Sequence, residues 1–339
     1  MRNKNLIDED CDLVLKSVGD FSKLRNKSVL VTGASGLVGI YLVNCLVKLK
    51  SELNLKIFCC VKTPPNEESK SLFDNCTLLV SDITRLETMN NLPNLDYIIH
   101  SAGYGQPLKF LEDEITTIKL NTTTTFSLFE KLKSDGCFLF ISSTEVYSGL
   151  DYIDVDESCI GSTNTDHPRC CYIEGKRTGE AICNIYLRQG YDVKIARLGH
   201  TYGPGTKKND KRVLTTLIDK GLTEESIKLM DEGSAIRTFC YIRDVVEMLF
   251  NIMLHGKDTT YNIGGVSKLS IYELACKIGN ILEKEVKIPQ SSNSMAGNPK
   301  IVNVSIQKYM NEFEKTPKNF VDFDEGLKRT IEWQTQFVG

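Results

Sequence analysis

The sequence has little net charge and no long hydrophobic run. Its 41 basic and 44 acidic residues leave a formal net charge of -3, which is too small to attract nucleic acid or an anionic membrane. No apolar run approaches the roughly 18 residues of a membrane span, and residues 1–27 are mixed and charged, without the apolar stretch of a signal peptide. We therefore expect a cytoplasmic protein with neither a nucleic-acid nor a membrane partner.

Metal ligands in a recognisable spacing are also absent. The four histidines are scattered, and the twelve cysteines include no Cys-x-x-Cys, so the sequence predicts no metal site. Scattered cysteines are typical of reduced thiols in the cytosol. What is present is an ordinary globular composition, with 41% hydrophobic and 25% charged residues in a chain of 339. This length suits one large domain, or a dominant domain with a smaller lobe.

Strands and helices alternate along the chain as far as about residue 203. The apolar run over 28–32 predicts a buried strand, and the apolar spacing over 37–50 predicts a helix. Further strands are expected over 55–61, 77–80, 97–100, 137–142 and 192–197. Helices are expected between them, notably over 115–134 and 173–189. This alternation predicts an α/β fold with a doubly wound parallel sheet.

A glycine-rich turn joins the first strand to the first helix of this alternation. It reads Thr-Gly-Ala-Ser-Gly-Leu-Val-Gly over residues 32–39. Such glycines allow a tight turn, a close approach to a pyrophosphate, and packing of the helix on the strand. The helix N-terminus adds N–H donors for the phosphates. The turn therefore predicts a Rossmann-type domain that binds a dinucleotide through Gly33, Ser35, Gly36, Leu37, Val38 and Gly39; a tight turn without a ligand is the alternative.

The ends of the next strands predict the remaining cofactor contacts. The second strand ends in Cys-Cys-Val followed by Lys62, without the carboxylate that binds a free adenosine ribose. Lys62 is either a partner for a 2′-phosphate or a solvated lysine, which leaves NAD and NADP both open. Asp82 and Ile83 after the third strand fit an adenine contact. Ser101, Ala102 and Gly103 after the fourth strand fit the ribose side of the cofactor.

A strand-ending hydroxyl cluster and a Tyr-x-x-x-Lys pair carry the chemistry. Residues 142–145 read Ser-Ser-Thr-Glu, and Tyr172 precedes Lys176 by four positions. Residues at that spacing share one face of a helix, so the Lys176 ammonium is expected beside the Tyr172 hydroxyl. A nearby cation favours the phenolate, which lets tyrosine act as a general base. A hydroxyl at the strand end orients the same substrate oxygen.

Together these motifs resemble the extended short-chain dehydrogenases/reductases of the NAD-dependent nucleotide-sugar epimerase/dehydratase family. Within that family the sequence is most similar to the UDP-glucuronate decarboxylases, also called UDP-xylose synthases. The likeness spans about residues 28–282 and is carried by the stretches 100–103, 142–147, 167–177, 196–197, 201–204, 209–213 and 237–244. The stretches Pro-Arg-x-Cys-Tyr-x-Glu-Gly-Lys-Arg (168–177) and Asn-Asp-x-Arg-Val (209–213) resemble the decarboxylase branch in particular.

The residue pair Thr144-Glu145 separates the reaction types of the family. The 4,6-dehydratases carry Asp-Glu there, with one carboxyl that protonates the departing hydroxyl and one that removes the C5 proton. The 4-epimerases have small residues and no glutamate. Thr144-Glu145 therefore resembles the decarboxylases and favours decarboxylation of an NDP-glucuronate. A strand-end carboxylate in a local salt bridge is the alternative for Glu145.

The resemblance implies a set of functional residues. It implies catalytic roles for Thr144, Glu145, Tyr172 and Lys176. To the cofactor contacts given above, namely Gly33, Ser35, Gly36, Leu37, Val38, Gly39, Lys62, Asp82, Ile83, Ser101, Ala102 and Gly103, it adds Asn121, Ser142, Tyr172, Lys176 and Arg197. For the nucleotide sugar it implies contacts from Ser143, Thr144, His200, Arg212, Val213, Lys228, Arg237 and Tyr241. It also implies NAD as cofactor, with NADP as the alternative, and a homodimer.

Two departures from the family pattern keep other reactions open. Where the family has an asparagine this sequence has His200, and where an arginine follows Gly-Pro it has Gly205. A 4-epimerase, a 4-dehydrogenase or a 4,6-dehydratase, all acting through transient C4 oxidation, is the alternative, and a non-catalytic dinucleotide sensor is a further one.

The organisation that follows has three parts. Residues 1–27 read as an N-terminal helical extension, and residues 28–203 as mainly the NAD(P)-binding Rossmann domain. Residues 204–339 read as mainly a smaller C-terminal nucleotide-sugar-binding lobe, part of which returns to the main sheet. Within that lobe we expect a helix near 212–221, a short strand near 226–230 and a helix near 243–255.

Overall fold

A computed structural model of the chain describes every residue except 1, 66, 151–153, 209, 290–300 and 339. Asn209, which begins the Asn-Asp-x-Arg-Val stretch, thus lies outside the described residues. The central feature is a seven-stranded sheet in the order β10-β6-β5-β4-β1-β2-β3. All of its strands run parallel. They are β1 (Ser28–Thr32), β2 (Lys56–Val61), β3 (Thr77–Val80), β4 (Leu95–His100), β5 (Leu132–Ser143), β6 (Asp192–Leu198) and β10 (Thr260–Ile263).

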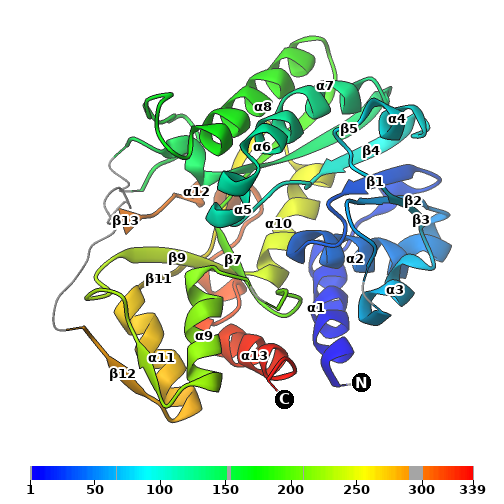
Figure 1. Cartoon of the computed structure of the whole chain (residues 1–339). Helices are drawn as coiled ribbons and strands as arrows, with labels where there is room; N and C mark the ends of the chain where they lie inside the picture. The colour runs from blue at the N-terminus through cyan, green and yellow to red at the C-terminus, as the bar shows by residue number, and fades with distance from the viewer. Residues whose placement is uncertain (1, 66, 151–153, 209, 290–300, 339) are drawn as a thin grey trace.

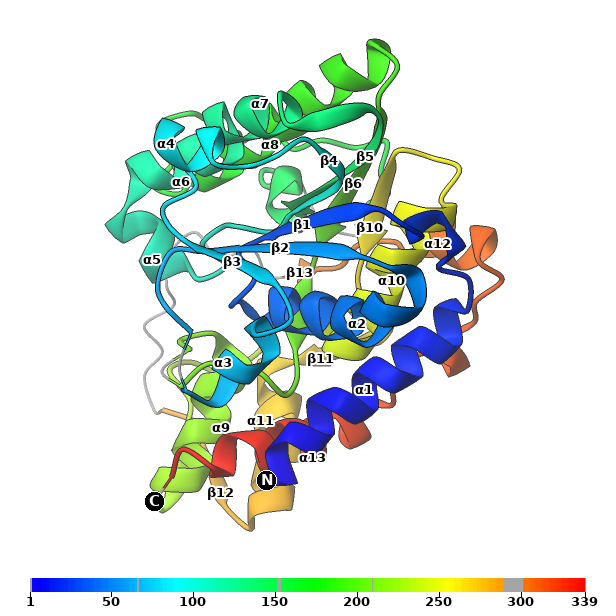
Figure 2. The same cartoon turned by 90° about the vertical axis from the view of Figure 1, so that its right-hand side faces the viewer.

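Helices cover both faces of this sheet, as Figures 1 and 2 show. One face packs on α2 (Leu37–Leu53) and α10 (Ile242–His255). The other packs on α6 (Glu114–Asn121), α7 (Thr123–Phe129) and α8 (Cys170–Arg188). The shorter helices of this half are α3 (Glu67–Phe73), α4 (Leu86–Asn90) and α5 (Pro107–Glu112). The doubly wound parallel sheet predicted from the alternating pattern is therefore confirmed.

The helix expected over 115–134 is wrong in its extent. The chain forms two helices that part at Thr122, and the second ends at Phe129. The Thr122 and Thr125 hydroxyls bond back to the carbonyls four residues earlier, a competition with helix geometry that bends or interrupts helices. Strand β5 then begins at Leu132 rather than at the expected residue 137.

The C-terminal part adds two small sheets. A four-stranded sheet runs β11-β9-β13, with β7 paired to β9, and a two-stranded sheet joins β12 to β8. Its strands are β7 (His200–Tyr202), β8 (Ser226–Lys228), β9 (Ile236–Tyr241), β11 (Ser267–Ser270), β12 (Glu285–Lys287) and β13 (Ile301–Val302). Its helices are α9 (Val213–Thr223), α11 (Ile271–Leu282), α12 (Gln307–Glu312) and α13 (Phe323–Thr335). Because β7 starts directly after β6, this part begins at the carboxyl edge of the main sheet.

The first residues form a helix that ties the two parts together. Helix α1 (Arg2–Val18) packs against α2, α10 and α13, as Figure 2 shows. Its Asp10 is 1% exposed and accepts hydrogen bonds from Tyr41 of α2 and Tyr241 of β9. Arg329 of α13 completes the cluster with an ion pair to Asp10 at 3.2 Å. In the described ranges, no helix is both long and apolar enough to cross a membrane.

Candidate active site

The glycine turn lies at the carboxyl end of β1 and is too tight for side chains. Gly33 has a φ of 66°, and a Cβ placed on it would lie 2.8 Å from the backbone of Ala102. A Cβ on Gly39 would lie 2.4 Å from the Gly33 carbonyl oxygen. The turn is also held from the side, because the Ser101 hydroxyl donates to the Thr32 carbonyl at 2.6 Å. Backbone therefore lines this cradle, which fits a diphosphate at the start of α2.

The ends of β2 and β3 form the next part of the cofactor edge. Lys62 lies just beyond β2 and donates to the Tyr104 hydroxyl at 3.0 Å. The Asp82 and Asp113 carboxylates lie 3.7 and 3.9 Å from the same ammonium. Ile83 is buried beside Asp82. Sequence reasoning missed Tyr104 and Asp113, which follow no cofactor motif.

The catalytic residues predicted from the sequence come together at the end of β5. Lys176 and Tyr172 share a face of α8, with the Lys176 ammonium 5.8 Å from the centre of the Tyr172 ring. The same ammonium donates to the Ile141 carbonyl at 2.7 Å and would lie 3.8 Å from a Cβ on Gly103. Ser143 Oγ accepts from the Glu145 N–H at 3.2 Å, where the short helix η2 (Thr144–Tyr147) begins.

Burial controls the protonation of this pair. It raises the pKa of Tyr172 to about 12, although a hydrogen bond with Ser143 and the charges of Arg169 and Arg212 act in the opposite direction. Burial also lowers the pKa of Lys176 to about 7, against the attraction of Glu180. The Tyr-x-x-x-Lys spacing predicts a phenolate favoured by the lysine. In the structure, burial acts against the charged form of each group, and the role of the lysine toward the phenolate stays a prediction.

The Glu145 carboxylate is held by an arginine, which also lies over an aromatic ring beside Tyr172. The Arg169 guanidinium donates to Glu145 at 2.5 Å and lies 5.5 Å over the ring of Phe110. The Phe110 ring stacks on Tyr172, with centroids 4.6 Å apart and planes at 9°. The Arg169 Nε atom is buried and has no hydrogen-bond partner among the residues that the structure describes. Glu145 thus forms a local salt bridge. An anion placed here would accept the hydrogen bond that the Arg169 Nε–H can still donate.

A second group of cations surrounds His200 on β7. Burial, together with the charges of Arg237, Arg212 and Arg169, lowers the pKa of His200 to about 4, so the imidazole is neutral near pH 7. Arg212, which caps α9 just before Val213, is clamped by Asp210 at 2.8 Å and also donates to the Thr201 carbonyl. This concentration of positive charge suits a diphosphate or carboxylate.

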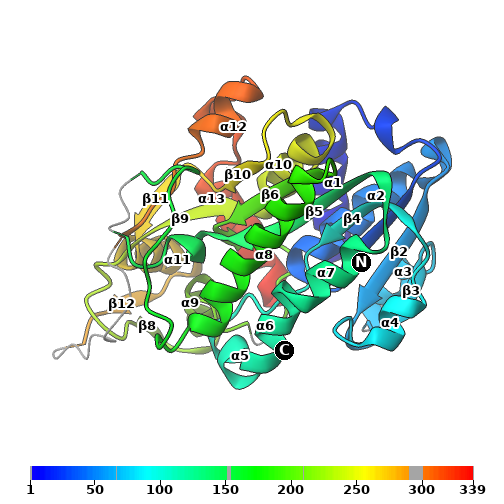
Figure 3. The same ribbon diagram turned by 90° about the horizontal axis from the view of Figure 1, so that it is seen from above.

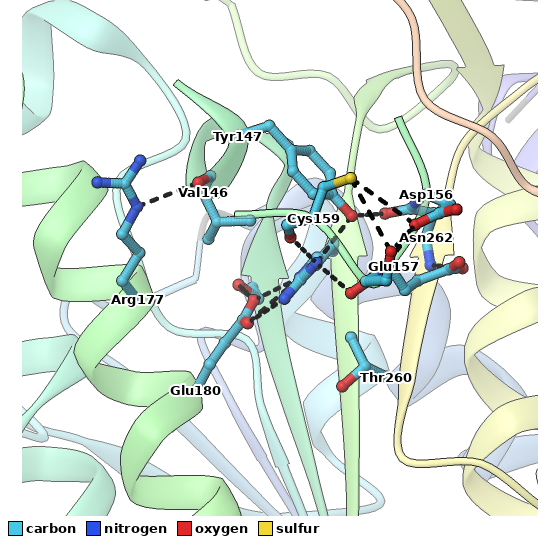
Figure 4. A network of polar contacts seen from close by, with 12 residues as sticks. Val146, Tyr147, Asp156, Glu157, Cys159, Arg177, Glu180, Thr260 and Asn262 are labelled. Carbon is cyan, nitrogen blue, oxygen red and sulfur yellow. Dashed lines mark hydrogen bonds and ion pairs between the residues drawn. The ribbon is translucent and has the colours of Figure 1, made fainter. Parts of the chain in front are cut away.

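Two residues with predicted cofactor contacts, Arg197 and Ser142, form hydrogen bonds within the protein. The Arg197 guanidinium bonds Glu180 at 2.8 Å and also the Tyr147 hydroxyl and two backbone carbonyls. The Ser142 hydroxyl donates to Glu180 at 2.5 Å. Figure 4 shows this network between α8 and β10. The Arg197 and Ser142 side chains thus bond Glu180 within the protein, and their predicted cofactor contacts stay predictions.

Tyr241, which is a predicted substrate contact, also forms hydrogen bonds within the protein. Its hydroxyl donates to Asp10 at 2.8 Å and accepts from Arg329 at 3.0 Å, and the side chain is buried. Asn121 is buried on α6, where its amide donates to the Thr117 carbonyl, and its Oδ1 atom has no partner in the described part of the chain. Lys228 lies exposed at the end of β8.

Comparison with known proteins identifies this arrangement. The model of the NAD dependent epimerase/dehydratase family matches residues 29–264. The chain belongs to this family. As predicted, it is a member of an NAD-dependent enzyme family, and it aligns with curated relatives along most of its length.

The relatives point to one branch of the family. UDP-glucuronic acid decarboxylase 1 of Danio rerio is 29% identical over 314 residues, which cover 92% of this chain and 73% of the relative. UDP-glucuronic acid decarboxylase 6 of Arabidopsis thaliana is 30% identical over 272 residues, or 79% of this chain and 78% of the relative. The fold is similar to that of UDP-glucuronic acid 4-epimerase from Bacillus cereus, with a TM-score of 0.76, 21% identity, and coverage of 91% of this chain and 99% of that one.

Proposed function

We propose that this family member is an NAD-dependent decarboxylase of UDP-glucuronate. The observation that carries the proposal is the strand end Thr144-Glu145, with Glu145 held on Arg169 beside the Tyr172 ring. A threonine hydroxyl cannot act as the acid of a dehydration, whereas a glutamate is present that an epimerase does not need. The decarboxylase names of the relatives support the same reading.

The chain's residues fit an NAD molecule at the carboxyl edge of the sheet. The side-chain-free cradle of Gly33, Gly36 and Gly39 would hold the diphosphate. Asp82 and Lys62 would face the adenosine, and Gly103 leaves room beside Lys176 for the nicotinamide ribose. When bound, NAD supplies a reversible hydride acceptor for the sugar C4 atom.

The catalytic groups would then act on one sugar oxygen and one ring carbon. Tyr172 would take the proton of the C4 hydroxyl, with the Lys176 ammonium stabilising the phenolate. Thr144 and Tyr172 would hydrogen-bond the C4 oxygen, which gathers negative charge when carbon dioxide leaves from the β position. Glu145 would move the protons of the sugar ring. The two hydroxyls therefore stabilise the charge that develops in the decarboxylation step.

The remaining substrate contacts are proposed on the C-terminal lobe, mainly residues 204–339. Arg212 and Arg237 would bind the diphosphate, because their charges converge on His200. The neutral His200 would donate or accept one hydrogen bond near the sugar. Val213 at the start of α9 and Lys228 at the end of β8 would border the nucleotide.

The decisive experiment is incubation with UDP-glucuronate and NAD, followed by carbon dioxide detection and mass spectrometry of the sugar nucleotide. We expect carbon dioxide and a UDP-pentose or UDP-4-keto-pentose, and no product from the Tyr172→Phe variant. An unchanged product mass with inverted stereochemistry would instead favour a 4-epimerase, and loss of water a 4,6-dehydratase. A hexosyl product with retained carbon and reduced cofactor would favour a 4-dehydrogenase, tested with UDP-, GDP-, CDP- and dTDP-sugars.

We infer that NAD binds more tightly than NADP. The two carboxylates near Lys62, Asp82 and Asp113, lie within 4.0 Å of its ammonium. They would repel a 2′-phosphate that approached the same lysine. Calorimetric titration with each dinucleotide tests this, and tighter binding of NADP would contradict it. The Asp82→Asn variant removes one of these negative charges, so it should reduce the difference in affinity between NAD and NADP.

We propose a homodimer formed through α6, α7 and α8, which lie side by side in Figure 3. These helices expose apolar side chains that no described part of the chain covers, with Ile115 69% and Phe126 43% exposed. Ile185 of α8 belongs to the same group, whereas Ile173 and Ile182 are buried inside the subunit. Light scattering should give twice the chain mass, and an Ile115→Asp variant should give a monomer. A monomeric wild-type protein would contradict the proposal.

We propose the cytoplasm as the compartment. All twelve cysteines are free, and several of them are buried. A reducing compartment such as the cytoplasm preserves free thiols. A fluorescent fusion seen outside the cytoplasm would contradict this. A UDP-pentose product suggests that the protein supplies a precursor for polysaccharides. The sugar composition of polysaccharides from a strain that lacks the gene would test this role.

A further inference from the structure

A buried ion pair lies directly behind the catalytic strand end. Glu180 follows Lys176 by one helical turn on α8, and its carboxylate accepts from Ser142 of β5 and from Arg197 of β6. The two charged side chains of this pair are 7% and 8% exposed. The mechanism proposed above gives this pair no role.

The pair fixes both ends of the segment that carries Ser143, Thr144 and Glu145. Before that segment, the Ser142 hydroxyl donates to Glu180 at 2.5 Å. After it, the Tyr147 hydroxyl accepts from Arg197 at 2.9 Å and donates to Asn262 of β10 at 2.7 Å (Figure 4). A shift of Glu180 would therefore be felt on both sides of the catalytic hydroxyls.

Helix α8 reinforces this attachment through two consecutive residues. Lys176 donates to the Ile141 carbonyl at 2.7 Å, and Arg177 donates to the Val146 and Ser148 carbonyls at 3.1 and 2.9 Å. The helix that carries the general base thus holds the strand end at its backbone as well. The relative placement of Tyr172 and Thr144 depends on these contacts.

Glu180 also contributes the negative charge that faces Lys176. Around that ammonium lie Tyr172 and Cys183 from α8, His100 from β4 and the Phe140 ring from β5. His100 is held neutral near pH 7, since burial lowers its pKa to about 4. Tyr172 and Cys183 are neutral there too, because burial raises the pKa of each. Glu180 is then the group that favours the charged form of Lys176.

We propose that Glu180 is a positioning residue of the active site, which acts through Ser142 and Arg197 on the Ser143–Glu145 segment and through its charge on Lys176. It touches neither substrate nor cofactor. Loss of Glu180 therefore changes the positions of the catalytic hydroxyls and the protonation of Lys176, while the glycine cradle on β1 and α2 remains intact.

The test compares Glu180→Gln with Glu247→Gln in the full chain. Glu247 of α10 also forms an ion pair, which is partly buried, with Lys315 at 2.6 Å, but this pair makes no hydrogen bond to the 141–148 segment. For Glu180→Gln we expect hydrogen exchange of the amides in 141–148 to quicken at least ten-fold relative to Glu247→Gln, with unchanged NAD content. We also expect kcat to fall at least ten-fold with little change in KM. The alkaline limb of the pH profile should move down by about one unit.

Ser142→Ala supplies a second variant that keeps the Glu180 charge, in case Glu180→Gln does not fold. It should quicken exchange of 141–148 and lower kcat without moving the alkaline limb. Equal exchange in 141–148 for the Glu180 and Glu247 variants would overturn the proposal, as would a Glu180→Gln variant with wild-type kcat and pH profile. The kinetic readings rest on the proposed function, whereas the exchange measurement does not, so a protein inactive on UDP-glucuronate still tests the positioning role.

Discussion

Replacing Lys176 by methionine should make the protein more stable and inactive. The ammonium is 5% exposed, and burial lowers its pKa from 10.5 to about 7. A lysine whose pKa is lower in the folded state binds fewer protons there than in the unfolded state between these two pH values. Stability due to this group therefore rises with pH across that window, and charging it at pH 7 or below is costly.

The size of the effect follows from the same values. At about 1.4 kcal/mol per pH unit, a fall in pKa from 10.5 to about 7 corresponds to roughly 5 kcal/mol, taken as an upper bound. Methionine also removes the hydrogen bond to the Ile141 carbonyl, which returns about 1 kcal/mol of that gain. We expect Lys176→Met to raise the free energy of unfolding by about 2 to 4 kcal/mol at pH 7.

Urea denaturation at pH 7 and pH 9.5, in one cofactor state, measures this gain. It should be largest at pH 7 and shrink towards pH 9.5. Lys194→Met is the matched control, because Lys194 is 8% exposed but its ammonium donates to the Gly256 and Asp258 carbonyls. That variant should lose stability. The reasoning is refuted if Lys176→Met is less stable than the wild type at pH 7, or if its gain does not depend on pH.

Three further predictions concern the cofactor turn, the base and the N-terminal helix. Gly39→Ala places a Cβ 2.4 Å from the Gly33 carbonyl, so calorimetry should find NAD binding lost while circular dichroism stays native. Tyr172→Phe should lower kcat about 10²- to 10⁴-fold with NAD still bound; ordinary turnover would rule out Tyr172 as the base. Asp10→Ala orphans two buried hydroxyls and should cost about 3 to 5 kcal/mol, whereas the exposed, ion-paired Asp12 should tolerate alanine in the same denaturation assay.

Local spacing predicted the parts of the site that a single helix or turn builds. The glycine turn and the Tyr172–Lys176 pair depend on residues a few positions apart, so their placement could be predicted from the chain order. The strand-ending positions of Ser143 and Glu145 followed from the alternation of strands and helices. These features need no knowledge of which distant residues meet.

Long-range packing decided the rest. The partner of Glu145 is Arg169, and the ring against Tyr172 is Phe110; neither contact follows from spacing, although Arg169 stands three residues before Tyr172. Arg197 matched a cofactor pattern, but only the fold shows Glu180 opposite it. Tyr241 bonds Asp10, which lies 231 residues away in the chain, and spacing does not reveal this contact either.

Helix α1 has a consequence for the order in which the chain is made. It leaves the ribosome well before α13, because Arg329, which α13 supplies to Asp10, follows it by 319 residues. Until then Cys11 and Val14, which are fully buried in the finished protein, have no complete surface to cover them. The nascent chain can build the early strands as they appear, but it cannot close the core around α1 until α13 has been made. A protein synthesised this way should depend on chaperones that shield α1 until α13 has left the ribosome.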